Sequence, residues 1–147
     1  MQDPKLKLKK MRPVVRARKV MLDRESAILA RIRESKVAKV SELRDRQASY
    51  LGGIDQINGE RAKGTMSLLE TLEAGVTKAK DDWYQCLREL REIEEKERQQ
   101  LAETLDARKD LKAVEKLEER YQDESVIADN RKEQKELDEI ALRKSRV

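Results

Sequence analysis

"NGERAKGT", residues 58 to 65, is the one strong break in a chain that otherwise follows a helical pattern. Asn58-Gly59 is a dipeptide typical of turns, and Gly64 marks the far side of the segment. Thr65 or Ser67 can cap a helix that follows. This stretch therefore predicts that the chain reverses here and that one helix lies on each side of the turn.

Apolar residues continue outward from the turn at helical spacing on both sides. Before it, the stripe contains Leu22, Leu29, Ile32, Lys36, Val40, Leu43, Gln47, Tyr50, Ile54 and Ile57, with Lys36 and Gln47 as its polar members. After it come Met66, Leu69, Leu72, Val76, Ala79, Trp83, Leu87, Leu90 and Ile93, and then, more thinly, Leu101, Leu105, Leu111, Val114, Leu117 and Tyr121. Such stripes predict an all-α fold, a long antiparallel two-helix coiled-coil hairpin.

The predicted hairpin is a single unit of residues 1–147. Pro13 and the turn segment set the boundaries between its parts. These parts are a basic N-terminal arm over 1–12, a first helix over 13–57, a turn over 58–64 and a second helix over 65–144. Proline is tolerated in the first turn of a helix, which places the expected start at Pro13. Counting back from the turn puts Leu43 beside Ala79, and leaves the end of the second helix projecting beyond its partner.

Composition excludes most catalytic chemistry. Charged residues make up 44% of the chain, and it has no His, which is the commonest general base and metal ligand. "GERAKGT" lacks the Gly-Lys-Ser/Thr ending of a phosphate-binding loop. We therefore expect no enzyme activity, no metal and no cofactor. Cys86 is the single cysteine, which excludes an intramolecular disulfide and suggests a small apolar filler.

Positive charge is concentrated at the N-terminus. Residues 1–20 contain eight Lys or Arg and one acid, whereas the whole chain has a net charge of +4. This cluster is read as a solvated basic end, as a surface for an acidic protein, or as a contact for nucleic acid or lipid. Aromatic side chains for base stacking are absent from it, so nucleic acid is not the expected partner.

Two surfaces of the hairpin carry apolar side chains that the stripes do not use. Leu51 and Leu68 lie beside the stripe near the turn, so either the seam is wide there or a patch is left for a partner. At the other end, "NRKEQKELDEIALR", residues 130 to 143, is highly charged but keeps Leu137 and Ile140 at helical spacing. No part of the chain is an apolar run of membrane-spanning length.

The C-terminal stretch carries a recognisable pattern. An Asn-Arg pair at 130–131 and a Gln-Lys pair at 134–135 lead into Leu137, Asp138 and Glu139. With the length and the long helices, this resembles the closing pattern of the FliJ family of flagellar export proteins, related to the YscO-type proteins of injectisomes. The specific similarity covers the C-terminal end and short pieces near the turn.

The resemblance implies a non-enzymatic, cytoplasmic component of the flagellar type III export complex, peripherally associated with the inner membrane. FliJ-like proteins are similar to the stalk subunit of rotary ATP synthases. One end enters the hexameric export ATPase (FliI-like) and promotes ring assembly. The hairpin contacts the export gate (FlhA-like), and export chaperones are further partners. The implied ATPase contacts are Arg131, Gln134, Lys135, Asp138 and Glu139, with Lys9, Arg12 and Arg16, and the implied gate contacts are Leu43, Tyr50, Leu68 and Leu72.

Other classes of function remain open from the residues alone. One alternative is a YscO-type injectisome stalk. A second is a coiled-coil scaffold that dimerises through the projecting helix, whereas a stalk of the FliJ type is expected to be monomeric alone. A third is a hairpin that binds nucleic acid through residues 5–19.

Overall fold

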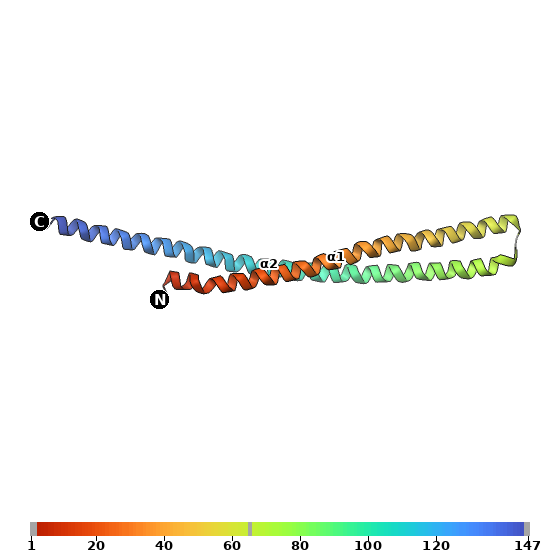
Figure 1. The fold of residues 1–147 in the computed structure, drawn as a ribbon, viewed down its shortest axis with the longest axis horizontal. Coiled ribbons are helices and arrows are strands. Elements are labelled where there is room, and N and C mark those ends of the chain that lie inside the picture. The colour runs from red at the N-terminus through yellow and green to blue at the C-terminus, as the bar shows by residue number, and fades with distance from the viewer. Residues whose placement is uncertain (1–2, 65, 146–147) are drawn as a thin grey trace. The chain divides into compact units, whose positions relative to one another are not determined.

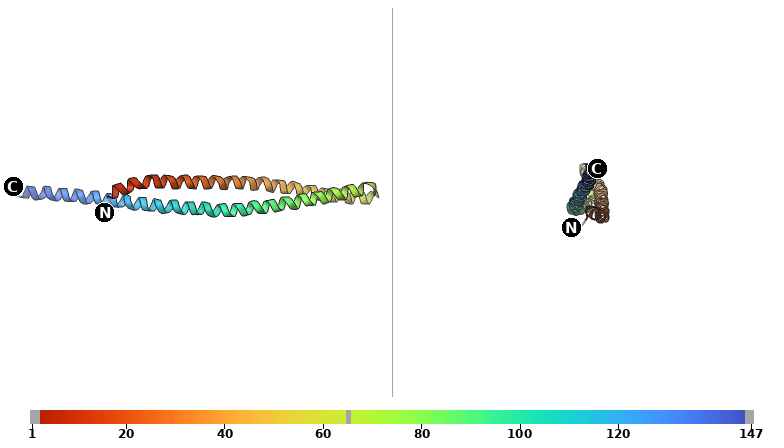
Figure 2. Two further views of the ribbon diagram at one scale, coloured as in Figure 1. Left: turned by 90° about the horizontal axis from the view of Figure 1, so that it is seen from below. Right: turned by 90° about the vertical axis from the view of Figure 1, so that its left-hand side faces the viewer.

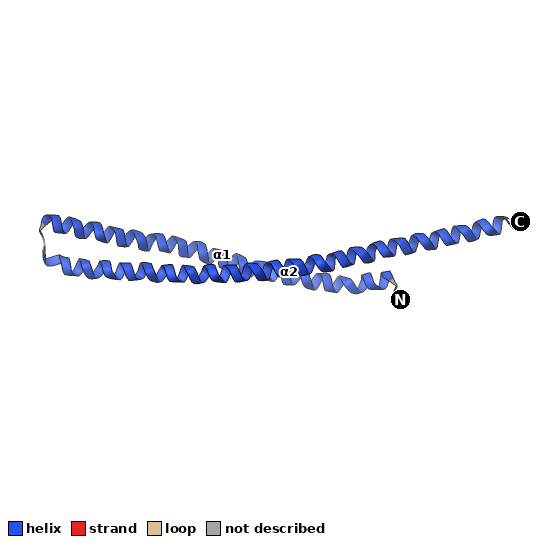
Figure 3. Cartoon of the chain, turned by 180° about the vertical axis from the view of Figure 1, so that it is seen from behind, coloured by secondary structure: helices blue, strands red, loops and turns tan. Residues whose placement is uncertain are grey.

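A computed structural model describes residues 3–64 and 66–145, and all elements over these residues are helical (Figure 3). Helix α1 spans Pro4–Lys63, a short 3-10 helix spans Met66–Leu68, and α2 spans Leu69–Ser145. Thr65, the predicted start of the second helix, lies outside the described residues, as do residues 1–2 of the predicted arm and residues 146–147.

Contacts divide the chain into two units. The terminal unit contains Met1–Glu25 and Glu103–Val147, and the turn unit contains Ser26–Ala102. Within each unit a segment of α1 packs along an antiparallel segment of α2 (Figures 1 and 2). The predicted fold class, an antiparallel hairpin of two long helices, is therefore confirmed. We call the contact line between the two helices the seam.

Helix α1 begins nine residues before the expected start. Asp3 caps it: its Oδ1 accepts a hydrogen bond from the Lys5 amide at 3.2 Å, and its carbonyl accepts from the Leu6 and Lys7 amides at 3.0 and 3.1 Å. Pro4 occupies the first turn, where its missing N–H costs nothing. The predicted separate arm over 1–12 is therefore helical from Pro4 onward.

Pro13, the expected first residue, lies inside α1. An interior proline leaves one carbonyl without its helical partner and disfavours the helix. Met11 and Val15 flank it and are both buried on the seam. Their burial offsets the local cost, which explains why the helix continues through a residue that sequence patterns treat as a boundary.

The turn lies later than expected, because α1 continues through Asn58-Gly59 to Lys63. The only described residue with positive φ is Gly64, at 72°, and its amide donates to the Arg61 carbonyl at 3.2 Å. The prediction that the helix ends at Ile57 is wrong. Ile57 is buried, and an Arg61–Glu73 ion pair of 3.2 Å ties the added turn to α2.

The later turn changes which residues face each other. Lys39 Nζ lies 2.6 Å from the Glu89 carboxylate, and Arg18 lies 3.6 Å from Asp110. Each partner is about six residues further along α2 than the count from Asn58-Gly59 predicted, which is more than one and a half helical turns. The predicted pairing of Leu43 with Ala79 is therefore wrong.

In the terminal unit, the buried residues of α2 are smaller and more polar than the predicted apolar stripe. Thr104 and Ala107 are buried there, and the Thr104 hydroxyl donates to the Glu25 carbonyl at 3.4 Å. Leu105, expected on the stripe, is exposed, as is Leu101 of the turn unit. The buried positions of α2 advance in steps of three and four through Gln100, Thr104, Ala107 and Leu111, so the helical period places Leu101 and Leu105 off the seam.

Candidate functional site

The terminal unit ends in a part of α2 that has no partner among the described residues of α1. The ion pair of Lys5 with Asp129, at 3.1 Å, joins the first turn of α1 to α2. Beyond it, α2 continues to Ser145, and every described side chain from residue 126 is exposed. We call residues 130–145 the overhang, which is about 24 Å long at the rise of an α-helix.

The overhang contains all five C-terminal residues of the predicted ATPase contact. They are exposed side chains of α2: Arg131, Gln134, Lys135, Asp138 and Glu139. The Gln134 amide donates to Asp138 Oδ1 at 3.1 Å, a bond between residues four apart on one face. Leu137, Ile140 and Leu142 are exposed on the same segment. The segment therefore presents charged and apolar groups together, and no described part of α1 covers them.

The N-terminal members of the predicted ATPase contact are exposed but lie elsewhere along the terminal unit. Arg12 lines a groove with residues 112–122 of α2. Arg18 pairs with Asp110, which places Arg16 near residue 112 or 113. Arg16 is thus on the order of 27 Å from Arg131 along the helix axis. The predicted contact residues do not form one cluster.

The predicted gate residues are distributed along the turn unit. Leu43, Tyr50 and Leu72 are half-buried on the seam. Tyr50 stacks on Trp83, with ring centroids 5.4 Å apart, and so contributes to the packing of the two helices. Leu68, in the 3-10 helix after the turn, has 52% of its surface exposed. Of the four, only Leu68 offers most of its side chain to a partner.

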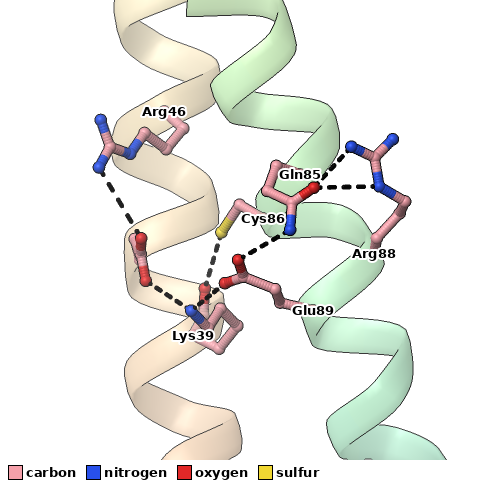
Figure 4. Close-up of polar contacts among 7 residues, drawn as sticks. Lys39, Arg46, Gln85, Cys86, Arg88 and Glu89 are labelled. Carbon is pink, nitrogen blue, oxygen red and sulfur yellow. Dashed lines mark hydrogen bonds and ion pairs between the residues drawn. The ribbon is translucent and has the colours of Figure 1, made fainter.

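A charged network crosses the seam of the turn unit (Figure 4). Lys39 donates to Glu89 at 2.6 Å and to Glu42 at 2.9 Å. The hydrogen bond to Glu89, followed by that to Glu42, raises the pKa of Lys39 above its ordinary value. The hydrogen bond from Lys39 lowers the pKa of Glu89, helped by the Gln85 amide. These shifts keep both groups charged, so the network joins the helices rather than poising a proton for transfer.

Cys86 lies beside this network and is buried. Its Sγ is 3.9 Å from the Lys39 carbonyl oxygen. Burial raises the pKa of the Cys86 thiol, which makes it less reactive at neutral pH. The burial of Cys86 agrees with the prediction of a small apolar filler.

The comparison with protein families bears on all of these surfaces. The family described as "Flagellar FliJ protein" matches residues 7–147, nearly the whole chain. The chain belongs to the FliJ family. No curated protein and no solved structure matches the chain. The match reaches well beyond the C-terminal pattern that carries the resemblance, and includes the turn and both helices.

Membership in the FliJ family makes the chain a non-catalytic coiled-coil component of the flagellar export apparatus. The described residues contain no group of three Cys, Asp or Glu able to hold a metal ion. Over the same part of the chain, no helix is long and apolar enough to cross a membrane.

Sequence reasoning missed two features of this FliJ-family chain. One is the Lys39–Glu89 network, for which the only local signal was Lys39 and Glu42 at a spacing of three. The other is the aromatic stack of the turn unit, which Tyr84 extends from Trp83 at a centroid distance of 5.3 Å. Tyr84 follows Trp83 directly, so a stripe of every third or fourth residue passes over it.

Proposed function

We propose that this FliJ-family chain is a stalk of the flagellar export ATPase. Its overhang occupies the central opening of a FliI-like hexamer and promotes assembly of that ring. The turn unit reaches a FlhA-like export gate and couples the ring to it, and export chaperones are further partners.

The overhang carries this proposal. It is a helix that extends past the start of its own partner segment, and its side chains are exposed to whatever surrounds it. Polar groups of both signs, such as Arg131 and Asp138, suit charge-assisted contacts with the interior of a ring. Leu137 and Ile140 add apolar surface that its own hairpin does not cover.

The test is an assembly assay with the export ATPase. Adding the chain to FliI should increase ring formation and ATP hydrolysis. Reversing two exposed charges, by Arg131→Glu and Lys135→Glu, should reduce that stimulation. The matched control reverses Lys63 and Lys78, which are exposed and have no ion pair among the described residues. Equal stimulation by both double variants would remove the overhang charges from the proposal.

The N-terminal cations make a separate prediction within the same proposal. Because Lys9, Arg12 and Arg16 lie far from the overhang along the helix, they would contact a different level of the ATPase. Reversing them should weaken ATPase binding with a smaller effect on the stimulation of hydrolysis. If only the overhang variants change binding, the ATPase contact is confined to the overhang.

The gate contact is tested through Leu68, the most exposed of its four residues. Leu68→Asp should reduce capture of the chain by the cytoplasmic part of the export gate. Leu105→Asp is the control, because Leu105 has similar exposure and belongs to the terminal unit. Retained capture by the Leu68 variant would exclude the turn from the gate surface.

The oligomeric state separates this proposal from a dimeric scaffold. A stalk that inserts into a ring as one hairpin should sediment as a monomer in analytical ultracentrifugation. A concentration-dependent dimer that Leu137→Asp dissolves would instead favour the scaffold, with the overhang as its pairing surface. The family match favours the flagellar system over the injectisome alternative.

A further inference from the structure

The terminal unit carries a second apolar stripe, on the side of α1 that faces away from α2. The stripe advances in steps of three or four through Leu6, Lys10, Pro13, Ala17, Val20 and Arg24. It lies two residues, or about 200°, from the seam positions Leu8, Met11 and Val15. Leu6 is 46% exposed and Val20 is 53% exposed. We call this stripe, with its neighbours Val14 and Met21, the outer face.

A shallow hollow on the outer face is formed by one helix alone. Its lining consists of Pro13, Arg16, Ala17, Val20, Met21 and Arg24, all from α1. The side chains of a single helix form a convex surface, so a second protein helix would find only one ridge of side chains to pack against. A flat, deformable surface can instead contact such a helix face along its whole length.

The charge of this segment is strongly positive and little compensated. Between Pro4 and Glu25, α1 has nine Lys or Arg and only Asp23 and Glu25 as acids. Two of the cations, Lys5 and Arg18, form ion pairs with α2. Six others have no ion pair among the described residues: Lys9, Lys10, Arg12, Arg16, Lys19 and Arg24. Their charge is therefore available to an external anion.

We propose that the outer face binds an anionic lipid surface. Helices that lie on membranes combine an apolar face with Lys and Arg, and cations near anionic headgroups strengthen the binding. Leu6, Val14, Val20 and Met21 would enter the headgroup region, while Lys10 and Arg24 meet lipid phosphates. This contact goes beyond the proposed contacts with the ATPase and the gate.

An acidic protein helix fits this region less well than a lipid surface. The place where a third helix would pack on a hairpin is the groove between α1 and α2. That groove is lined by Leu8 and Val15, by four Lys or Arg side chains, and by Glu115, Glu118 and Glu119. Its charges nearly balance, so it offers an acidic helix little net attraction, whereas the outer face has no acid within its stripe.

Vesicle co-sedimentation of the full chain tests the proposal. The probes are vesicles of phosphatidylcholine alone and of phosphatidylcholine mixed with phosphatidylglycerol. The chain should sediment with the mixed vesicles only, and added salt should release it. Lys10→Glu with Arg24→Glu should lower the partition coefficient by at least about tenfold. The control with Lys63→Glu and Lys78→Glu has the same net charge and should lose much less.

A second pair of variants tests the apolar part of the face. Val20→Gln with Met21→Gln should lower the partition coefficient severalfold, and Val37→Gln, at a 71% exposed valine of the turn unit, should not. Circular dichroism checks that all variants remain helical. Equal loss in the face variants and their controls would overturn the proposal. So would binding to polyglutamate but not to mixed vesicles, which would make the face a protein-docking surface.

Discussion

Two adjacent glycines of α1, Gly52 and Gly53, differ in the space that is available for a Cβ atom. A Cβ added at Gly52 would meet no atom within 4 Å, whereas a Cβ added at Gly53 would lie 2.8 Å from Val76 Cγ2. Alanine is more favourable than glycine inside a helix by about 0.8–1.0 kcal/mol. Gly52→Ala should therefore stabilise the hairpin by about 1 kcal/mol.

The same substitution at Gly53 adds a steric cost to this helical gain. Overpacking costs about 1–3 kcal/mol, since the branched Val76 side chain must move. Gly53→Ala should therefore be neutral or destabilising by up to about 2 kcal/mol. The two variants should differ by about 1–3 kcal/mol, or several degrees in Tm at about 2–4 °C per kcal/mol.

Thermal unfolding followed by far-UV circular dichroism measures the difference. The double variant Gly53→Ala with Val76→Ala supplies the control. Because removing the valine methyls should relieve the clash, the double variant should be more stable than the sum of the two single changes predicts. If Gly53→Ala stabilises as much as Gly52→Ala, then Gly53 does not face Val76. The register of the turn unit would then be wrong.

The remaining predictions concern the turn and the charged seam. Gly59→Ala should raise Tm, because Gly59 is helical and an added Cβ would meet no atom within 4 Å. Gly64→Ala should lower Tm, because it forces alanine into a positive φ. Equal shifts in Tm would contradict a turn at Gly64. Cys86 should react severalfold more slowly with iodoacetamide in the native chain than in urea, because burial raises its pKa, and equal rates would contradict its burial. Since Lys39 lowers the pKa of Glu89, the Glu89 contribution to stability is present above the ordinary pKa of about 4.5 and is lost as the pH falls through the lowered value. A plot of Tm against pH should therefore flatten at its acid limb in Glu89→Gln, and an unchanged limb would contradict the network.

The hairpin was predictable because helical period and a single glycine-rich break are both visible in sequence. The exact turn was not, since Asn58-Gly59 is the stronger local signal and Gly64 is the residue that adopts positive φ. Burial of Ile57 and pairing of Arg61 with Glu73 decide between them. Those are contacts with α2, which no local pattern contains.

The seam of the terminal unit shows the same limit in another form. Leucine is among the residue types most often buried, so Leu105 was expected on the seam. The phase of α2 instead buries Thr104 and Ala107. A small or polar residue reaches the seam when the helical period brings it there and a partner, here the Glu25 carbonyl, receives its hydroxyl.

That the end of α2 projects beyond its partner followed from counting back from the turn, but the extent of the overhang did not. Its length is set by where α1 begins, and the cap at Asp3 moved that start from Pro13 to Pro4. The candidate contacts in the overhang came from a family pattern, and the family match covers these residues without testing the role of any of them. The distance of Arg12 and Arg16 from the overhang could be known only from the register of α1 against α2, which the pair of Arg18 with Asp110 fixes.

Over the residues that the structure describes, the overhang is held in helical form by bonds within α2, such as the one from Gln134 to Asp138. Most helical stability in proteins comes from packing an apolar face on a partner, so the backbone amides of the overhang should exchange with deuterium long before those of the seam. A partner that grips the segment must offset the entropy of holding it rigid. Slower hydrogen exchange over residues 130–145 in the presence of a partner would therefore show which backbone amides of the overhang the partner holds in helical form.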